Sequence, residues 1–239
     1  MATSFQKQMQ TQTLIQYLEQ NQEEIGPVVP HDLSAPNVCR LDLTANNQAL
    51  AHANLTNTQA FDELINEMLQ IQNATIGVGG YLEDRVIYRR SQHFDALQDK
   101  RSVHLGIDIW TAAFTPILAP LDGRVHSFQD NNNFGDYGPT IILEHELEEG
   151  KFYTLYGHLT RTSLQHLHPG QIIKKGEEFA QFGPFPENGD WPPHLHFQLM
   201  TDLLGMMGDF PGVCTLKQQD QFSKICLDPN LILKSKVLA

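Results

Sequence analysis

The 239-residue chain has few cysteines and an excess of negative charge. Its 3 cysteines are an odd number and show no Cys-x-x-Cys spacing, so we expect reduced thiols rather than a disulfide framework. The 16 Lys and Arg against 28 Asp and Glu give a formal net charge of −12. This acidic balance argues against nucleic-acid binding, which requires a basic surface.

The sequence also lacks a long apolar run. The longest charge-free apolar stretch, Ile109–Leu121, contains Pro116 and Pro120 and is shorter than the roughly 20 residues of a spanning helix, so no membrane span is expected. The N-terminus does not have the charged-then-apolar order of a secretion signal, which predicts a cytoplasmic location. Export by another route, or earlier removal of a leader, is compatible with the same sequence.

Hydrophobic periodicity divides the chain into regions. Residues 1–77 are expected to form a helical and irregular extension, whose clearest helix has Thr58 as N-cap. Its apolar stripe consists of Phe61, Leu64, Ile65, Met68 and Leu69, and Gly77, Gly79 and Gly80 are expected to end it. Residues 78–232 contain short β segments separated by turn signals, and residues 233–239 form a tail. This pattern predicts a mainly β fold, an antiparallel β-sandwich or barrel with an N-terminal helical extension.

The predicted strands are Val86–Tyr88, Val103–Ile109, Arg124–Phe128, Thr140–Glu146, Phe152–Tyr156, Gln171–Ile173, Glu178–Phe182 and Leu195–Met200.

The segment His104-Leu-Gly-Ile-Asp108 places an imidazole and a carboxylate four residues apart. That spacing puts both side chains on one face of a strand, and the β-branched neighbours favour a strand here. One nitrogen and one oxygen donor on a common face suit Zn²⁺. A His and an Asp four apart are more often unrelated surface groups, so this motif needs support from others.

Two His-Leu-His pairs occur, His166/His168 and His194/His196. With 11 histidines in the chain, roughly half of one such pair is expected by chance, so the context has to decide. His168 runs into a Pro-Gly turn, whereas His196 leads into the alternating segment Phe197–Leu199. We therefore interpret His194 and His196 as the functional pair, and His166 and His168 as a solvated turn.

A third motif, Tyr156-Gly-His158-Leu159, ends an apolar stretch. In order, the motifs HxGxD, YxHL and PHLHF resemble the signature of the lysostaphin-like (LytM-type) zinc metallopeptidases. The segments Thr115–Val125 and Pro169–Gly176 resemble the connecting hairpins of that family. The resemblance covers about residues 81–200.

This resemblance implies a metal site and two catalytic histidines. The positions that hold Zn²⁺ in the family correspond here to His104, Asp108 and His196, with one ion per chain. His194 resembles the general base, and His158 resembles the residue that orients water or stabilises the oxyanion. Zn²⁺ lowers the pKa of bound water toward ~7, and a neutral imidazole accepts the remaining proton. The implied function is that of a zinc metalloendopeptidase with a peptide substrate, in particular peptidoglycan-type peptides.

The sequence departs from the family near the last motif. Gln198 replaces the usual Glu, and the preceding loop, Gly183–Pro193, differs from the usual Gly/Ser/Thr-rich loop. This loop and Asp130–Tyr137 are expected to form the walls of the substrate groove. Three segments look more like a sub-branch fused to kinase-like phosphotransferase and aminotransferase modules: Tyr81–Arg85, Trp191–Leu199 and Asp228–Asn230. This resemblance weakens the extrapolation to peptidoglycan.

Two other functional classes fit parts of the sequence. A catalytically silent binding or regulatory module on the same fold is the main alternative, although such members lose ligands that this chain keeps. A biotinyl- or lipoyl-like carrier is suggested by the hairpin at Lys174 and Lys175, but the flanking pattern of a modified lysine is absent. The remaining candidates are expected to be structural or at the surface: His31, His52, His93, His126, His145 and Asp209. The sequence leaves the oligomeric state open.

Overall fold

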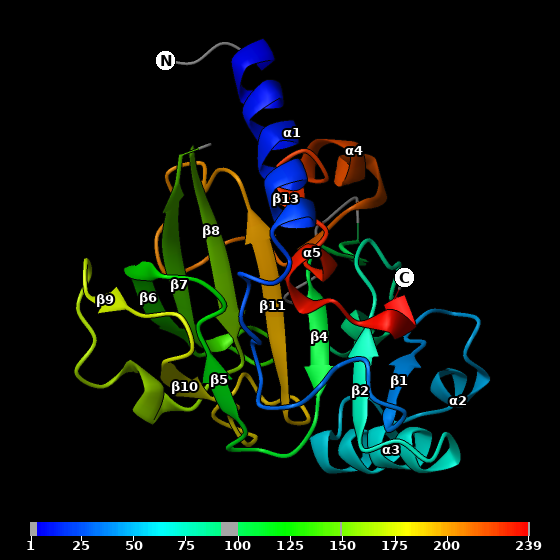
Figure 1. Ribbon diagram of the computed structural model, residues 1–239. Helices are drawn as coiled ribbons and strands as arrows, with labels where there is room; N and C mark the ends of the chain where they lie inside the picture. The colour runs from blue at the N-terminus through cyan, green and yellow to red at the C-terminus, as the bar shows by residue number, and fades with distance from the viewer. Residues whose placement is uncertain (1–3, 92–99, 149, 239) are drawn as a thin grey trace.

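The computed structural model describes residues 4–91, 100–148 and 150–238. Its centre is a nine-stranded sheet in the order β1-β2-β4-β11-β8-β7-β6-β9, with β13 paired to one end of β11 (Figure 1). The strands of this sheet are β1 (Val38–Leu41), β2 (Ile76–Gly79), β4 (Ile107–Trp110), β6 (Gly123–Asn131), β7 (Gly138–Leu147), β8 (Gly150–Gly157), β9 (Ile172–Ile173), β11 (His194–Met200) and β13 (Cys226–Leu227).

Two short ribbons and several helices complete the fold. The ribbons pair β5 (Pro116–Leu118) with β10 (Glu178–Gln181), and β3 (Val103–His104) with β12 (Val213–Cys214). The α-helices are α1 (Ser4–Gln20), α2 (Gln48–Ala51), α3 (Thr58–Ile71), α4 (Gln219–Phe222) and α5 (Asn230–Leu233). Short 3₁₀ turns lie at Ile87–Arg90, Arg161–Leu164, Leu216–Gln218 and Lys236–Leu238.

The predicted mainly β, antiparallel fold is confirmed. Across the described ranges, β1 with β2 is the one parallel pair, and no pairing joins β1 to β9, so the sheet is open rather than closed into a barrel. The six segments predicted between Arg124 and Met200 correspond to β6 through β11. Alternating apolar residues and glycine-containing turns make this part of the sheet readable from sequence.

The N-terminal residues share the core of the sheet. Leu14 and Leu18 of α1 are buried in the same apolar cluster as residues of β4, β7, β8 and β11. β1 and β2 extend the sheet at one edge (Figure 1). The division at residue 77 into an extension and a metallopeptidase domain stays a prediction.

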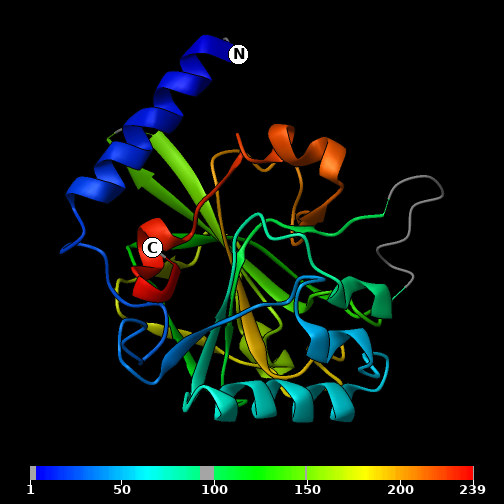
Figure 2. The same ribbon diagram turned by 90° about the vertical axis from the view of Figure 1, so that its right-hand side faces the viewer.

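Helix α3 forms because one of its faces is apolar. Phe61, Ile65 and Met68 are buried, and the helix lies across the ends of β1 and β2 (Figure 2). The expected N-cap is corrected by one residue: the Asn57 side chain accepts a hydrogen bond from the Ala60 amide at 3.0 Å. Thr58 is the first helical residue, and its hydroxyl donates to the Asp190 carbonyl at 3.0 Å, which ties α3 to the loop before β11.

The glycines after α3 form the buried strand β2 instead of a simple helix stop. A Cβ on Gly77 would lie 2.4 Å from Leu41 Cδ1 and 3.1 Å from Leu69 Cδ2. Glycine is therefore present here because α3 and β1 approach the strand closely. Glycine is usually depleted in strands, which is why β2 was missed.

Two other strand predictions require correction. Val86–Tyr88 is not a strand, because Ile87–Arg90 forms a 3₁₀ turn. The predicted strand Val103–Ile109 is interrupted at Leu105-Gly106 and becomes β3 and β4, which pair with different partners.

The cysteines are unpaired in the structure, and the helices are short or polar. Cys39, Cys214 and Cys226 are free and buried. In the part of the chain that the structure describes, no helix is both long enough and apolar enough to span a membrane.

Candidate metal centre and active site

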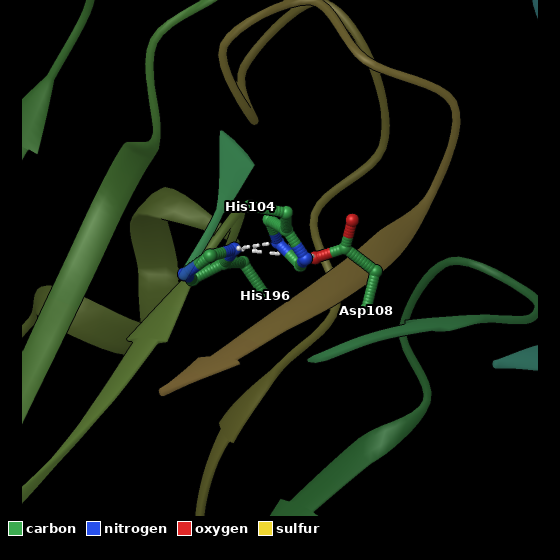
Figure 3. A group of neighbouring side chains, drawn as sticks. All are labelled: His104, Asp108 and His196. Atoms are coloured by element: carbon green, nitrogen blue, oxygen red, sulfur yellow. Dashed lines mark hydrogen bonds and ion pairs between the residues drawn. The ribbon is translucent and has the colours of Figure 1, made fainter. Parts of the chain in front are cut away.

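Three predicted metal ligands converge at the junction of β3, β4 and β11 (Figure 3). His104 Nε2 lies 3.1 Å from Asp108 Oδ1, and His196 Nδ1 lies 3.2 Å from the same oxygen. The two imidazole nitrogens are 2.9 Å apart. The sheet register produces this arrangement, because His196 on β11 lies directly opposite Asp108 on β4.

The spacing of the three donor atoms fits a tetrahedral ion. Metal–ligand bonds of about 2.0–2.1 Å imply ligand–ligand separations of about 3.3 Å in a tetrahedron. The observed separations of 2.9, 3.1 and 3.2 Å are close to that value. His104, Asp108 and His196 can therefore hold a Zn²⁺ ion with small shifts, and three protein ligands leave one position for water or substrate.

Hydrogen bonds on the far side of each imidazole fix which nitrogen faces the centre. His104 Nδ1 donates to the Gly80 carbonyl at 3.0 Å, which leaves a lone pair on its Nε2. His196 Nε2 donates to the Gln198 side-chain carbonyl at 3.0 Å, which leaves a lone pair on its Nδ1. Gln198, the departure from the family pattern, thus orients a predicted ligand.

The Asp108 carboxylate is held by a buried arginine. Arg85 binds Asp108 Oδ2, while Glu83 Oε2 accepts from Arg85 Nε at 2.9 Å. This contact leaves Oδ1 facing the two histidines. Burial alone would raise the pKa of Asp108, but the adjacent His104 ring and the Arg85 guanidinium hold it well below its usual range.

Arg85 lies in the segment Tyr81–Arg85, and the sequence alone predicts no contact between its side chain and the metal ligands. Charge alone could not indicate one, because an arginine side chain is usually solvated. Its complete burial beside Asp108 and Glu83 becomes visible only in the structure.

The two predicted catalytic histidines lie beside the candidate metal centre. His194 and His158 have ring centroids 4.1 Å apart, and Trp110 stacks on His194 at 4.0 Å. His194 Nδ1 donates to the Pro192 carbonyl, and His158 Nδ1 donates to the Asn188 carbonyl, both at 2.8 Å. In the neutral rings, each Nε2 is therefore a proton acceptor.

Burial keeps both catalytic candidates neutral. It lowers the pKa of His194 to about 4 and that of His158 well below its ordinary value, and repulsion from His194 adds to the shift of His158. His158 also has a left-handed backbone (φ +64°), which a non-glycine residue adopts at a cost of about 1–2 kcal/mol. This conformation is held by backbone bonds from His158 N to Tyr137 O and from Gly183 N to His158 O, each 2.8 Å.

Gly106 explains why the first motif has a glycine between the two ligands. A Cβ at this position would lie 2.8 Å from His196 Cε1 and Nε2 and 2.7 Å from the Phe197 carbonyl. The imidazole of His196 occupies the space that any larger residue would need.

A cavity of about 290 Å³ opens onto these groups. Of the two predicted walls, Asp130–Tyr137 contributes Gly135, Asp136 and Tyr137, and Gly183–Pro193 contributes Trp191. A third wall, formed by Met206 and residues 209–213, was not predicted because that segment has no periodic pattern. Asp209, expected to be structural or at the surface, is exposed and lines this cavity.

The other histidines are distributed as the sequence context suggested. His166 and His168 are exposed in a turn. His31 and His52 are exposed, and His126 is half-buried. His145 is buried on β7, opposite Phe152 of β8. His93 lies outside the described residues.

Comparisons with known proteins agree with the motif analysis. An uncharacterized metalloprotease of Haemophilus influenzae is 33% identical over 95 residues, which are 40% of this chain and 18% of that protein. The chain thus matches less than a fifth of that relative's length.

Among solved structures, the lysostaphin catalytic domain of Staphylococcus simulans aligns with TM-score 0.38 and 24% identity, over 56% of this chain and 81% of that one. A zinc containing peptidase from Vibrio cholerae aligns with TM-score 0.32 and 25% identity, over 41% and 27%. Residues 102–206 match the model of Peptidase family M23, so the resemblance to lysostaphin-like metallopeptidases is confirmed for this segment.

Proposed function

We propose that the protein is a zinc-dependent endopeptidase. The observation that carries this proposal is the convergence of three metal-ligand donors beside a cavity that two of them line together with two neutral histidines. The M23 match of residues 102–206 supports a metallopeptidase. The intact set of five positions disfavours the catalytically silent module, which would have lost one or more of them.

His104, Asp108 and His196 would hold the ion. When bound, Zn²⁺ supplies Lewis-acid chemistry: it polarises the scissile carbonyl and lowers the pKa of water. The side-chain hydrogen bonds from Arg85 and to Gln198 keep the ligands oriented before the ion arrives.

His194 is the proposed general base. Its Nδ1 proton is committed to the Pro192 carbonyl, so its Nε2 lone pair is available to take a proton from the attacking water. Trp110 stacks on the His194 ring, and the His158 ring also packs against it. These two contacts restrict rotation of the His194 side chain.

His158 has the same tautomer as His194, and in its resting neutral form its Nε2 accepts rather than donates. We therefore assign it to orienting the attacking water. A role in donating to an oxyanion requires that His158 first take up a proton.

A short peptide is the proposed substrate, and peptidoglycan-type peptides are the finer proposal, which rests on the family resemblance alone. The test begins with metal analysis of protein purified without chelator, where one zinc per chain is expected. Hydrolysis of purified wall fragments and of a general peptide library is then measured before and after removal of the metal by chelator and its readdition. Metal-dependent cleavage of either substrate set supports the peptidase. Stoichiometric zinc without any cleavage would instead favour the silent binding module.

A further inference from the structure

The cavity beside the candidate metal centre is lined by polar and by apolar side chains. Its polar lining includes Asp108, His158, His194 and His196. Charged residues of both signs, Arg101, Asp136 and Asp209, also line it. Its apolar lining includes Ile87, Met206, Phe210, Pro211 and Val213. A ligand in this cavity therefore meets both predicted metal ligands and an apolar surface.

One apolar residue of the cavity lining, Met206, belongs to an exposed loop with two further apolar side chains. Leu204, Met206 and Met207 are 49%, 39% and 63% exposed. Three of the eight large hydrophobic side chains that are exposed in the described residues therefore lie within four consecutive positions. Single exposed apolar residues are ordinary, but a cluster next to a cavity indicates a binding surface.

This loop, residues 203–210, is firmly anchored although its apolar side chains face solvent. Leu203 and Phe210 are buried at its two ends. Between them, Gly208 N donates to Ser127 Oγ at 2.8 Å, and Asn131 Nδ2 donates to the Gly208 carbonyl at 3.0 Å. These contacts fix the loop backbone at Gly208 and at its two ends.

The backbone of the loop also carries strain. Leu204 has a left-handed conformation (φ +53°), which costs a non-glycine residue about 1–2 kcal/mol. Gly208 approaches β6 so closely that a Cβ there would lie 2.7 Å from Gln129 Cβ. Anchoring and strain together hold the apolar side chains out beside the cavity.

We infer that the loop 203–210 forms a subsite for a large apolar side chain of the peptide substrate, such as Leu, Met or Phe, next to the scissile amide. This inference rests on the proposed peptidase function, and it favours a substrate with a large apolar side chain over the small-residue peptides of the peptidoglycan type. Met206 belongs both to the cavity and to the exposed cluster, so a side chain from a peptide bound at the metal centre reaches the loop directly. A peptide made only of Gly and Ala would leave this surface in water and forgo the free energy of covering it.

The test uses a set of peptides of equal length in which one position at a time is Gly, Ala, Leu or Phe. Hydrolysis is followed as kcat/KM with the zinc-loaded protein, and binding is followed as Kd with the His194→Ala variant. At one position, Leu and Phe are expected to be favoured over Gly by about 10-fold, the lower end of apolar pocket discrimination because the subsite is half-exposed. Met206→Ser should reduce this preference to about 2-fold.

Ile172→Ser is the matched control, because Ile172 is 54% exposed on β9, at the far end of the sheet order. It should leave the preference intact. The inference is overturned if kcat/KM and Kd are equal for all four side chains, or if the preference survives in Met206→Ser. Hydrolysis of the peptides in either case still supports the peptidase. A preference for Leu and Phe in the Kd values, without hydrolysis of any peptide, supports the apolar subsite and contradicts the peptidase. If Met206→Ser instead abolishes binding to phosphatidylglycerol–phosphatidylethanolamine vesicles and peptides show no preference, the loop is a lipid contact and the inference is wrong.

Discussion

The two His-Leu-His segments have the same sequence and opposite surroundings. His194 and His196 lie on β11, a strand with every residue buried, and are flanked by β4 and β8. His166 and His168 are exposed beside the Pro169-Gly170 turn. The difference shows that the chemistry of this tripeptide comes from the strand register and the carbonyl groups that receive its ring protons.

The largest expected difference is in metal affinity, when one histidine of each pair is replaced. His196→Ala removes one of three proposed ligands, so metal affinity should fall by more than the roughly 10–100-fold typical of losing a ligand's hydrogen-bond partner. His168→Ala should leave metal content unchanged. Metal analysis after dialysis against a zinc buffer measures both. Retained zinc in His196→Ala would remove this residue from the ligand set.

Within the buried pair, the two histidines are expected to separate metal binding from catalysis. His194→Ala should keep zinc near one per chain and lower kcat by about 10²–10⁴-fold, the usual contribution of a general base. His166→Ala provides the exposed counterpart and should retain full activity. Emptying of the site in His194→Ala, with zinc retained in His196→Ala, would show that His194 and not His196 is the ligand.

His145, a buried histidine away from the candidate metal centre, extends the comparison to stability. His145 Nδ1 donates to the Asp122 carbonyl, its Nε2 is 2.8 Å from Thr154 Oγ1, and burial lowers its pKa to about 4. This lies below the unfolded value of about 6.5, so its stabilising contribution is complete above pH 6.5 and is lost as the pH falls toward 4.

Between pH 7 and 4.5, the metal-free protein should lose about 2–3 kcal/mol more unfolding free energy than His145→Gln. Urea denaturation measures the difference. His166→Gln is the exposed control and should follow the wild type. Parallel pH dependence of wild type and His145→Gln would mean that His145 does not stay neutral in the folded state.

Replacing a glycine near each His-Leu-His pair by alanine should have the smallest effect, a change in the free energy of unfolding. Gly106→Ala places a methyl group against the His196 ring and the Phe197 carbonyl, so stability should fall by about 1–3 kcal/mol and zinc affinity with it. Gly170→Ala adds a methyl group where nothing lies within 4 Å, although its φ of +83° still adds about 1 kcal/mol of backbone strain. Unfolding measurements with and without zinc distinguish the two: a zinc-dependent component is expected only in Gly106→Ala.

Sequence reasoning succeeded where side-chain alternation and motif order agree. β6 to β11 were readable because apolar residues alternate and turns contain glycine. Three motifs in order also predict five site residues that the structure brings together, and their roles stay a prediction. β2 was missed because its glycines reflect close packing against Leu41 and Leu69, which local propensity does not encode. Residues 206–213 were missed as a cavity wall because the contacts that anchor them come from Ser127 and Asn131, far away in the chain.

The convergence of β3, β4 and β11 has a thermodynamic consequence. His104 and His196 are separated by 92 positions in the chain, so a cation shared by them would act as a reversible cross-link that the unfolded chain cannot form. At a free zinc concentration about 1,000 times the dissociation constant, mass action adds about 4 kcal/mol to the stability of the folded state. The melting temperature should therefore rise with free zinc, and a titration of divalent ions read by thermal unfolding would rank their affinities without any substrate.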